Sequence, residues 1–180
     1  MENHGIDTTC AFTGHRPYRF LFGYDESHPL CKKIKAALRT ACIDLYQQNA
    51  VRTFISGCAL GVDQWALEEA IKLRDSEFFD MQVCCAAPYR DFANRWSVQQ
   101  KKRLRSIWDA ADVKGFVGNR YGNDVYFQRN RFMVDRARFL IAVYDRNEEK
   151  ASGTRQTVEY ARRNRRSILF IHPDTGEISR

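Results

Sequence analysis

The chain has 180 residues, of which 44% are hydrophobic and 13% aromatic, a composition that suits one folded domain with a buried core. Its start lacks the basic and apolar segments of a signal peptide, and no apolar run approaches the roughly 20 residues of a membrane-spanning helix. We therefore expect a soluble, cytoplasmic protein that has no membrane partner.

The formal net charge is +7, and the excess is unevenly placed. Residues 90–138 contain twelve Lys and Arg against five Asp, a difference of +7 that equals the charge of the whole chain. A basic surface attracts phosphate, either in a nucleotide or in a nucleic acid. Solvated helix faces account for most basic runs of this kind, so the charge alone does not identify a ligand.

The six cysteines, at positions 10, 31, 42, 58, 84 and 85, include no CxxC pair. Cys84 and Cys85 are adjacent in a predicted strand, so their side chains point to opposite faces of the sheet and cannot easily share a metal ion. The sequence therefore predicts reduced, buried cysteines that pack as small hydrophobic residues, and it predicts no metal site.

Apolar periodicity predicts strands that alternate with helices along the chain. The predicted strands cover residues 8–13, 51–56, 81–87, 113–117, 139–144 and 167–171. The predicted helices cover residues 30–46, 62–74, 91–111, 125–137 and 153–164, and residues 146–152 form a polar loop. This alternation predicts a single α/β domain with a core at about residues 8–171: a Rossmann-like, doubly wound, mainly parallel sheet with helices on both faces. The strand order cannot be deduced from the sequence.

The carboxyl ends of parallel strands meet at one edge of a sheet, where open α/β sheets bind their ligands. Residues 13–16, 56–63, 88–90, 118–121 and 145–154 should therefore converge there.

Two of these segments are glycine turns that enter helices. Gly57 and Gly61 bracket the first, and Gly153 with Thr154 opens the second. Backbone N–H groups at a helix start are unpaired, and glycine lets a ligand approach closely, so such a turn can hold a phosphate. Neither turn has the Walker A or the GxGxxG spacing. One such turn is as readily a simple connection, but two at one edge favour a phosphate site.

Side chains at the same edge add hydrogen-bond donors. Thr13, Ser56 and Thr154 supply hydroxyl groups. Arg16 and Arg131 supply guanidinium groups whose geometry suits phosphate oxygens, and the helix that carries Arg131 leads directly into the strand at 139–144.

The same segments also contain candidates for base stacking and for acid–base chemistry. Tyr89 could stack on a nucleobase, and Asp145 closes the strand at 139–144. His15 is a candidate general acid or base, or a residue that only hydrogen-bonds its loop. Asp63 could bind a ribose hydroxyl or stabilise its own helix start. Glu159 lies in the middle of a helix, where a packing or solvated role outweighs a catalytic one.

Five ordered motifs resemble one family: TGHRP, SGCALGVD, APYRDF, RNRFMVDRA followed by FLIAVYD, and SGTRQTVEYA. They are similar to the SLOG superfamily, which includes DNA-processing protein A and the LOG proteins, and most to its YpsA/YoqJ branch from bacteria and phages. The likeness extends over about residues 10–171. It implies a Rossmann-like fold and a pocket for a nucleotide or nucleotide derivative at Thr13, Gly14, His15, Arg16, Ser56, Gly57, Gly61, Asp63, Arg131, Gly153 and Thr154.

The chain departs from the LOG pattern at its last turn. LOG enzymes have PGGxGTxxE there, and the glutamate serves the hydrolysis of an N-glycosidic bond. Here Thr157 occupies the position of that glutamate, and Glu159 would have to replace it from another face of the helix. The resemblance therefore implies binding more firmly than reaction.

The sequence favours a module that binds or senses a nucleotide or nucleotide-derived ligand, with NAD or ADP-ribose among the candidates. One alternative is a nucleotide N-glycosidase or phosphoribohydrolase-like hydrolase that uses His15, Asp63 or Asp145. Another is a module that binds single-stranded nucleic acid. The oligomeric state stays open, with a homodimer among the alternatives.

Overall fold

The computed structural model describes residues 5–146 and 151–180, so most of the predicted polar loop lies outside the described residues. The strands are β1 (Thr9–Gly14), β2 (Thr53–Ser56), β3 (Gln82–Ala87), β4 (Val113–Phe116), β5 (Phe139–Val143), β6 (Ser167–Ile171) and β7 (Ile178–Ser179). The helices are α1 (Pro29–Asn49), α2 (Val62–Ser76), α3 (Val98–Ala110), α4 (Val125–Asp135) and α5 (Gly153–Arg163). Within the described ranges, no helix combines the length and the hydrophobicity needed to cross a bilayer.

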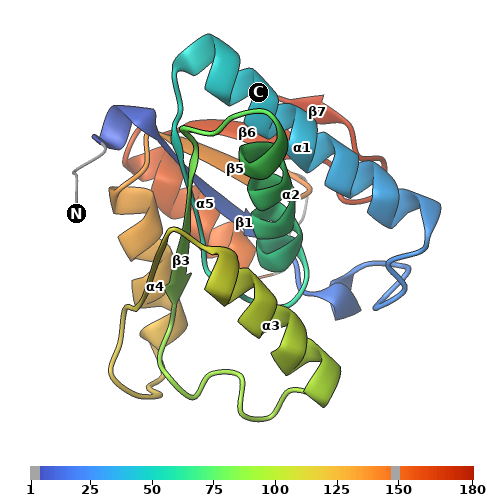
Figure 1. The fold of residues 1–180 in the computed structure, drawn as a ribbon, viewed down its shortest axis with the longest axis vertical. Coiled ribbons are helices and arrows are strands. Elements are labelled where there is room, and N and C mark those ends of the chain that lie inside the picture. Colours follow the sequence, from blue (N-terminus) through green and yellow to red (C-terminus); the bar gives the residue numbers. More distant parts are fainter. Residues whose placement is uncertain (1–4, 147–150) are drawn as a thin grey trace.

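The seven strands form one sheet in the order β4-β3-β2-β1-β5-β6-β7 (Figure 1). The first six are parallel, and β7 pairs antiparallel with β6. The predicted doubly wound, Rossmann-like sheet is therefore confirmed. The strand order reverses between β1 and β5, and a parallel α/β sheet opens a crevice at the carboxyl ends of the strands where this happens.

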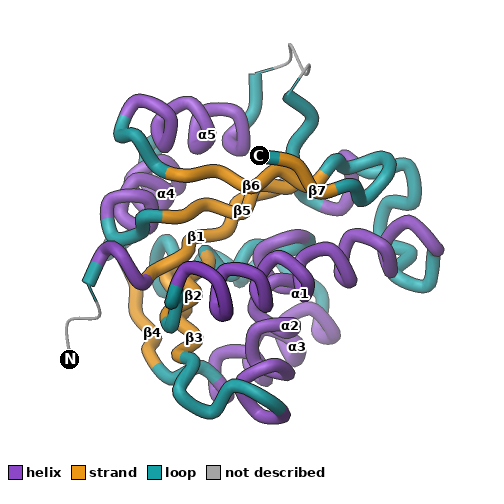
Figure 2. Tube along the Cα trace, turned by 90° about the horizontal axis from the view of Figure 1, so that it is seen from above, coloured by secondary structure: helices purple, strands orange, loops and turns teal. Residues whose placement is uncertain are grey.

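Helices cover both faces of the sheet, with α1, α2 and α3 on one side and α4 and α5 on the other (Figure 2). Alternate strand residues serve the two cores: Cys10 and Phe12 of β1 pack toward α1 and α2, and Ala11 packs toward α4 and α5. Cys84 and Cys85 divide in the same way, and all six cysteines are buried and free of disulfides, as predicted.

One predicted helix start was wrong, and one strand was not predicted. The helix expected from residue 91 begins only at Val98, because Ser97 and Gln100 form a reciprocal capping box in which each side chain bonds the other's backbone N–H. Strand β7 was not predicted at all, since a strand of two exposed residues carries no periodic signal.

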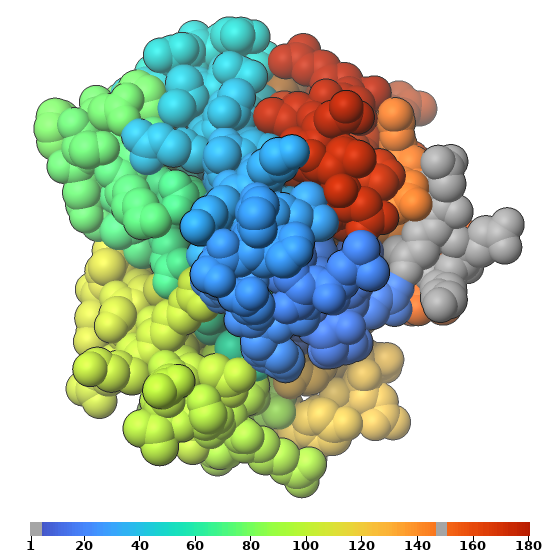
Figure 3. Space-filling model, turned by 90° about the vertical axis from the view of Figure 1, so that its right-hand side faces the viewer, coloured from blue at the N-terminus to red at the C-terminus, as the bar shows by residue number. Residues whose placement is uncertain are grey.

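The segment between β1 and α1 wraps across the N-terminal end of α2. Phe20 and Phe22 stack on each other and pack against the buried Trp65. Burial would raise the pKa of Glu26, but hydrogen bonds from Arg103, Lys35 and Trp65 outweigh it and hold that pKa at about 2. In Figure 3 this blue segment lies between the yellow-green α3 and the red C-terminal residues. Its anchoring fixes one wall of the site described next.

Candidate functional site

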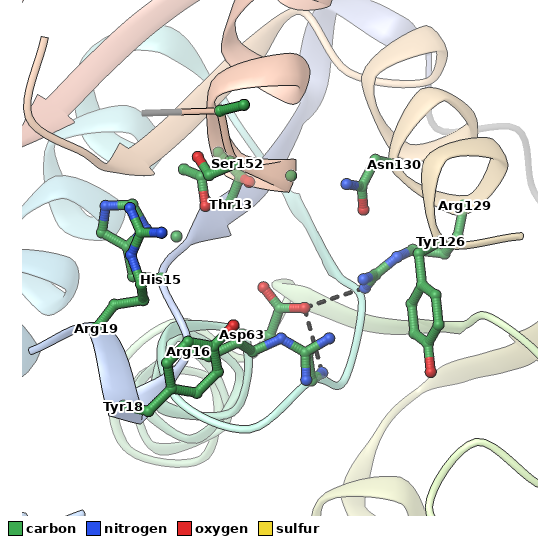
Figure 4. A pocket seen from close by; sticks show the side chains of 15 residues that line it. Thr13, His15, Arg16, Tyr18, Arg19, Asp63, Tyr126, Arg129, Asn130 and Ser152 are labelled. Atoms are coloured by element: carbon green, nitrogen blue, oxygen red, sulfur yellow. Dashed lines mark hydrogen bonds and ion pairs between the residues drawn. The ribbon is translucent and has the colours of Figure 1, made fainter. Parts of the chain in front are cut away.

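A polar pocket of about 280 Å³ opens at the carboxyl ends of β1 and β5, where the strand order reverses. Figure 4 shows its side chains, which come from β1 and the turn after it, the start of α2, α4 and the start of α5. It is lined by Thr13, Gly14, His15, Arg16, Tyr18, Arg19, Ala59, Asp63, Tyr126, Arg129, Asn130, Ala151, Ser152, Gly153 and Thr154.

A buried ion pair lies in this pocket. Arg129 Nη1 donates to Asp63 Oδ2 at 3.0 Å, and the two residues are only 4% and 7% exposed (Figure 4). The same carboxylate oxygen accepts the backbone N–H of Ala59 at 3.2 Å. Arg129 Nε is buried and has no hydrogen-bond acceptor among the described residues. Asp63 therefore holds the turn before α2 and the Arg129 guanidinium at once.

Gly57 provides the space for that guanidinium. A Cβ added at Gly57 would lie 0.8 Å from Arg129 Nη1 and 2.0 Å from its Cζ. The glycine predicted to admit a phosphate therefore admits an arginine side chain that lines the pocket, and Gly57 itself is not a lining residue.

The helical period of α4 explains why Arg129, and not Arg131, enters the site. Val125, Arg129 and Met133 are four residues apart and are all buried against the sheet side of the helix. Arg131 lies two residues away and is exposed, with its guanidinium over the rings of Phe127 and Tyr160 at 4.2 and 4.9 Å. The sequence placed Arg131 at the edge and missed Arg129, although the spacing of Val125 and Met133 was a usable signal.

The start of α5 forms the opposite wall. Ser152 caps the helix by accepting the N–H of Arg155, and Gly153 has open space beside it. The first N–H groups of a helix have no carbonyl partner inside the helix, so these amides suit an anion.

Thr157 occupies the place where LOG enzymes carry glutamate. Its hydroxyl donates to the Gly153 carbonyl at 2.7 Å and accepts from Asn130 Nδ2 at 2.9 Å. Thr157 is thus a buried link between α4 and α5. Glu159 bonds Arg155 at 2.9 Å and does not line the pocket.

The end of β1 supplies the remaining wall. Thr13, Gly14, His15 and Arg16 all line the pocket, as do the exposed Tyr18 and Arg19, which the sequence did not single out. Tyr126 of α4 adds a second aromatic ring (Figure 4).

His15 is buried beside the rings of Phe20 and Tyr144. Burial and the nearby Arg19 lower the pKa of His15 to about 4 from its ordinary 6.5, and Asp174 and Asp145 only partly oppose this shift. The imidazole is therefore neutral at neutral pH, when it can accept as well as donate a hydrogen bond.

The lowered pKa of His15 predicts a pH-dependent stability. Below pH about 6.5 the unfolded chain gains a proton that the folded chain accepts only near pH 4, so stability is complete above this window and falls as the pH drops through it. We expect a loss of about 2–4 kcal/mol in the free energy of unfolding, measured by urea denaturation across this range. His15→Gln should remove this part of the slope, and an unchanged slope in that variant would contradict the assignment.

The other predicted residues lie outside the pocket lining. Ser56 Oγ donates to the Asp63 carbonyl, and Gly61 adopts a positive φ of 90° where a Cβ would meet the His15 carbonyl oxygen at 2.8 Å. Tyr89 packs edge-on against Tyr121 and Tyr126 beside the pocket. Asp145 lies 3.9 Å from His172 Nε2, in a neighbouring depression.

A larger cavity of about 830 Å³ lies under β2, β3 and β4. Its lining is mainly apolar, with Ile55, Cys84, Phe116 and Phe132 among its residues. Size alone would favour it, but a nucleotide needs converging polar and cationic groups, and those lie in the smaller pocket. Among the described residues, no group of His, Cys, Asp and Glu could hold a metal ion.

The sequence of this chain matches one protein family over most of its length. The model of the YspA SLOG family matches residues 10–175. A UPF0398 protein of Bacillus licheniformis is 31% identical over 142 residues, covering 77% of this chain and 75% of that protein. The UPF0398 protein YpsA of Bacillus subtilis is 28% identical over 142 residues, with 77% of each chain covered.

Two solved structures share the architecture at 18% identity and a TM-score of 0.58. DNA processing protein A from Streptococcus pneumoniae aligns with 91% of this chain, which spans 50% of the length of that protein. The Helicobacter pylori protein of the same name is described for its single-stranded DNA binding mode. The alignment with it covers 92% of this chain and 65% of the Helicobacter pylori chain. At this identity the likeness establishes the fold alone.

Proposed function

This chain belongs to the YspA SLOG family, and from that premise we propose that its pocket binds a nucleotide or a nucleotide-derived ligand through the phosphate. The observation that carries the proposal is the buried Arg129, held by Asp63 beside the open start of α5. Burying a guanidinium costs desolvation free energy, and binding of a phosphate at this position would explain why a charged side chain is buried here.

The charge of the pocket supports an anionic ligand. Arg16, Arg19 and Arg129 line it together with the positive end of the α5 helix dipole, and Asp63 is the one carboxylate among its lining residues in the described chain. A guanidinium has five N–H donors, and the ion pair with Asp63 uses one of the two at Nη1. Donors therefore remain for phosphate oxygens.

The arrangement of the walls suggests an orientation for the ligand. The phosphate would lie at Gly153 and Thr154, where helix amides and the buried Thr154 hydroxyl meet. The rings of Tyr18 and Tyr126, on the β1 side and the α4 side of the pocket, would contact the base.

Calorimetry against nucleoside monophosphates, ADP-ribose, NAD and cyclic dinucleotides tests this function. We expect saturable binding by at least one of them, and we expect Arg16→Gln to weaken it about tenfold because a charge-assisted hydrogen bond is lost. Arg120→Gln removes the same charge from an exposed site outside the pocket and should change nothing. No binding across the panel, or equal weakening by both variants, would contradict the proposal.

The proposal assigns no reaction. Asp63 is the carboxylate that lines the pocket among the described residues, and it is engaged with Arg129 and the Ala59 amide. Incubation of the protein with the bound nucleotide or with NAD, followed by chromatography, would detect a hydrolase that uses this carboxylate or His15.

A further inference from the structure

The outer surface of α4 and α5 concentrates the positive charge of the chain. Residues 131–138 and 151–166 contain eight arginines and two acidic residues, a difference of +6 against +7 for the whole chain. By contrast, Arg103 within the basic run of α3 is engaged by Glu26 and Glu68. Six of these arginines are exposed and are here termed the arginine face: Arg131, Arg136, Arg138, Arg162, Arg163 and Arg165.

Little of this charge is compensated within the molecule. Of the two acidic residues, Asp135 accepts the hydroxyl of Tyr160 at 2.8 Å and Glu159 bonds Arg155 at 2.9 Å. Arg138 pairs with Asp7 at 3.1 Å. Across residues 5–146 and 151–180, no carboxylate forms an ion pair with the other five members of the arginine face.

Aromatic rings hold several of these guanidinium groups in place. Arg136 lies 3.6 Å from the ring centroid of Phe132, and Arg162 lies 5.6 Å from that of Phe170. Arg131 lies between Phe127 and Tyr160, so it bridges the two helices. A guanidinium stacked on a ring has lost part of its rotamer freedom already and still offers its outer face and its N–H groups.

The ordinary role of basic residues at helix ends does not account for the whole set. Arg162 and Arg163 in the last turn of α5 suit the negative end of the helix dipole. Arg131 lies in the middle of α4, and Arg138 and Arg165 lie beyond the helix ends. None of the six arginines lines the pocket, and Arg162, Arg163 and Arg165 lie at or just beyond the far end of α5, about 15 Å along the helix from its start at the pocket.

We propose that the arginine face binds a single-stranded polynucleotide, with its arginines on successive phosphates and the guanidinium groups of Arg131, Arg136 and Arg162, which lie over aromatic rings, beneath the bases. Uncompensated positive charge matches the phosphate backbone, and planar guanidinium groups stack on any base. An acidic peptide or an anionic lipid headgroup would use the positive charge but not the guanidinium groups that lie over aromatic rings, so the base-stacking contact favours a polynucleotide. The face is independent of the nucleotide pocket.

Fluorescence anisotropy with labelled oligo(dT) and oligo(rU) of about 20 nucleotides tests the proposal. The variant Arg162→Gln/Arg163→Gln/Arg165→Gln should bind at least about tenfold more weakly, and the slope of log K against log salt should fall by about 2, because three phosphate contacts are lost. The control Lys101→Gln/Lys102→Gln/Arg105→Gln makes the same change in net charge on exposed residues of α3, on the opposite side of the sheet. It should bind as the unmodified protein does.

Three results would overturn the proposal: no binding to either oligonucleotide, equal weakening by the two triple variants, or binding only to vesicles containing phosphatidylserine. Arg16→Gln in the pocket should leave oligonucleotide binding unchanged, so failure here and failure of the nucleotide pocket are distinguishable. A midpoint temperature of thermal unfolding equal to that of the unmodified protein, for both triple variants, would show that these surface changes leave the fold intact.

Discussion

Replacing Arg129 with methionine is expected to lower the free energy of unfolding by about 3–5 kcal/mol, measured by urea denaturation. Among the described residues, the change leaves the buried Asp63 carboxylate with the backbone N–H of Ala59 as its remaining hydrogen-bond partner. An unpaired buried charge is among the most destabilising single changes a core can suffer.

A second substitution separates stability from function. In Arg129→Met/Asp63→Asn the buried charge is gone, and the asparagine oxygen can still accept the Ala59 N–H. Most of the lost stability should return, because removing both partners of a buried pair costs far less than removing one. Ligand binding should stay lost, because the guanidinium proposed to bind the phosphate is absent. A double variant as unstable as the single one would contradict the role of the pair.

Replacing Gly57 with alanine should expel the Arg129 guanidinium from its place. The new Cβ would overlap Nη1, and the surrounding backbone of β2 and α2 is buried and cannot yield easily. We expect a loss of about 2–5 kcal/mol in the free energy of unfolding together with loss of ligand binding.

Two controls make this prediction specific. Gly115→Ala introduces the same methyl group in β4, where nothing lies within 4 Å, and should leave stability unchanged within about 0.5 kcal/mol. In an Arg129→Ala background the space beside Gly57 is vacant, so Gly57→Ala should cost less than about 1 kcal/mol. The same cost in both backgrounds would show that Arg129 is not what the glycine accommodates.

The fold was largely predictable from the sequence because its signals are local. Buried strands and amphipathic helices repeat every two or about four residues, and six strands and five helices were found from those periods. The start of α3 was predicted too early because Trp96 fits the apolar pattern of the helix. The capping box makes Ser97 the N-cap, so the helix begins only after it.

The location of the pocket was predictable from the sequence, but the identity of its lining residues was less so. Thr13 to Arg16, Asp63, Gly153 and Thr154 come together because a parallel sheet brings its carboxyl ends to one edge. Arg129 was missed because its burial depends on the rotation of α4 about its axis, which in the sequence is indicated only by the four-residue spacing of Val125 and Met133 around it. Gly57 was identified, but its use depends on a side chain 72 residues away in sequence, which no local pattern shows.

Amide NMR with ADP-ribose and AMP, each added to millimolar concentration, tests the central claim most directly. We expect the largest shifts at Gly14, Ala59, Gly153 and Thr154, the backbone of the pocket between β1 and β5. Shifts that gather instead at Ile55, Cys84 and Phe116, in the apolar cavity under β2 to β4, or the absence of any shift with either nucleotide, would contradict it.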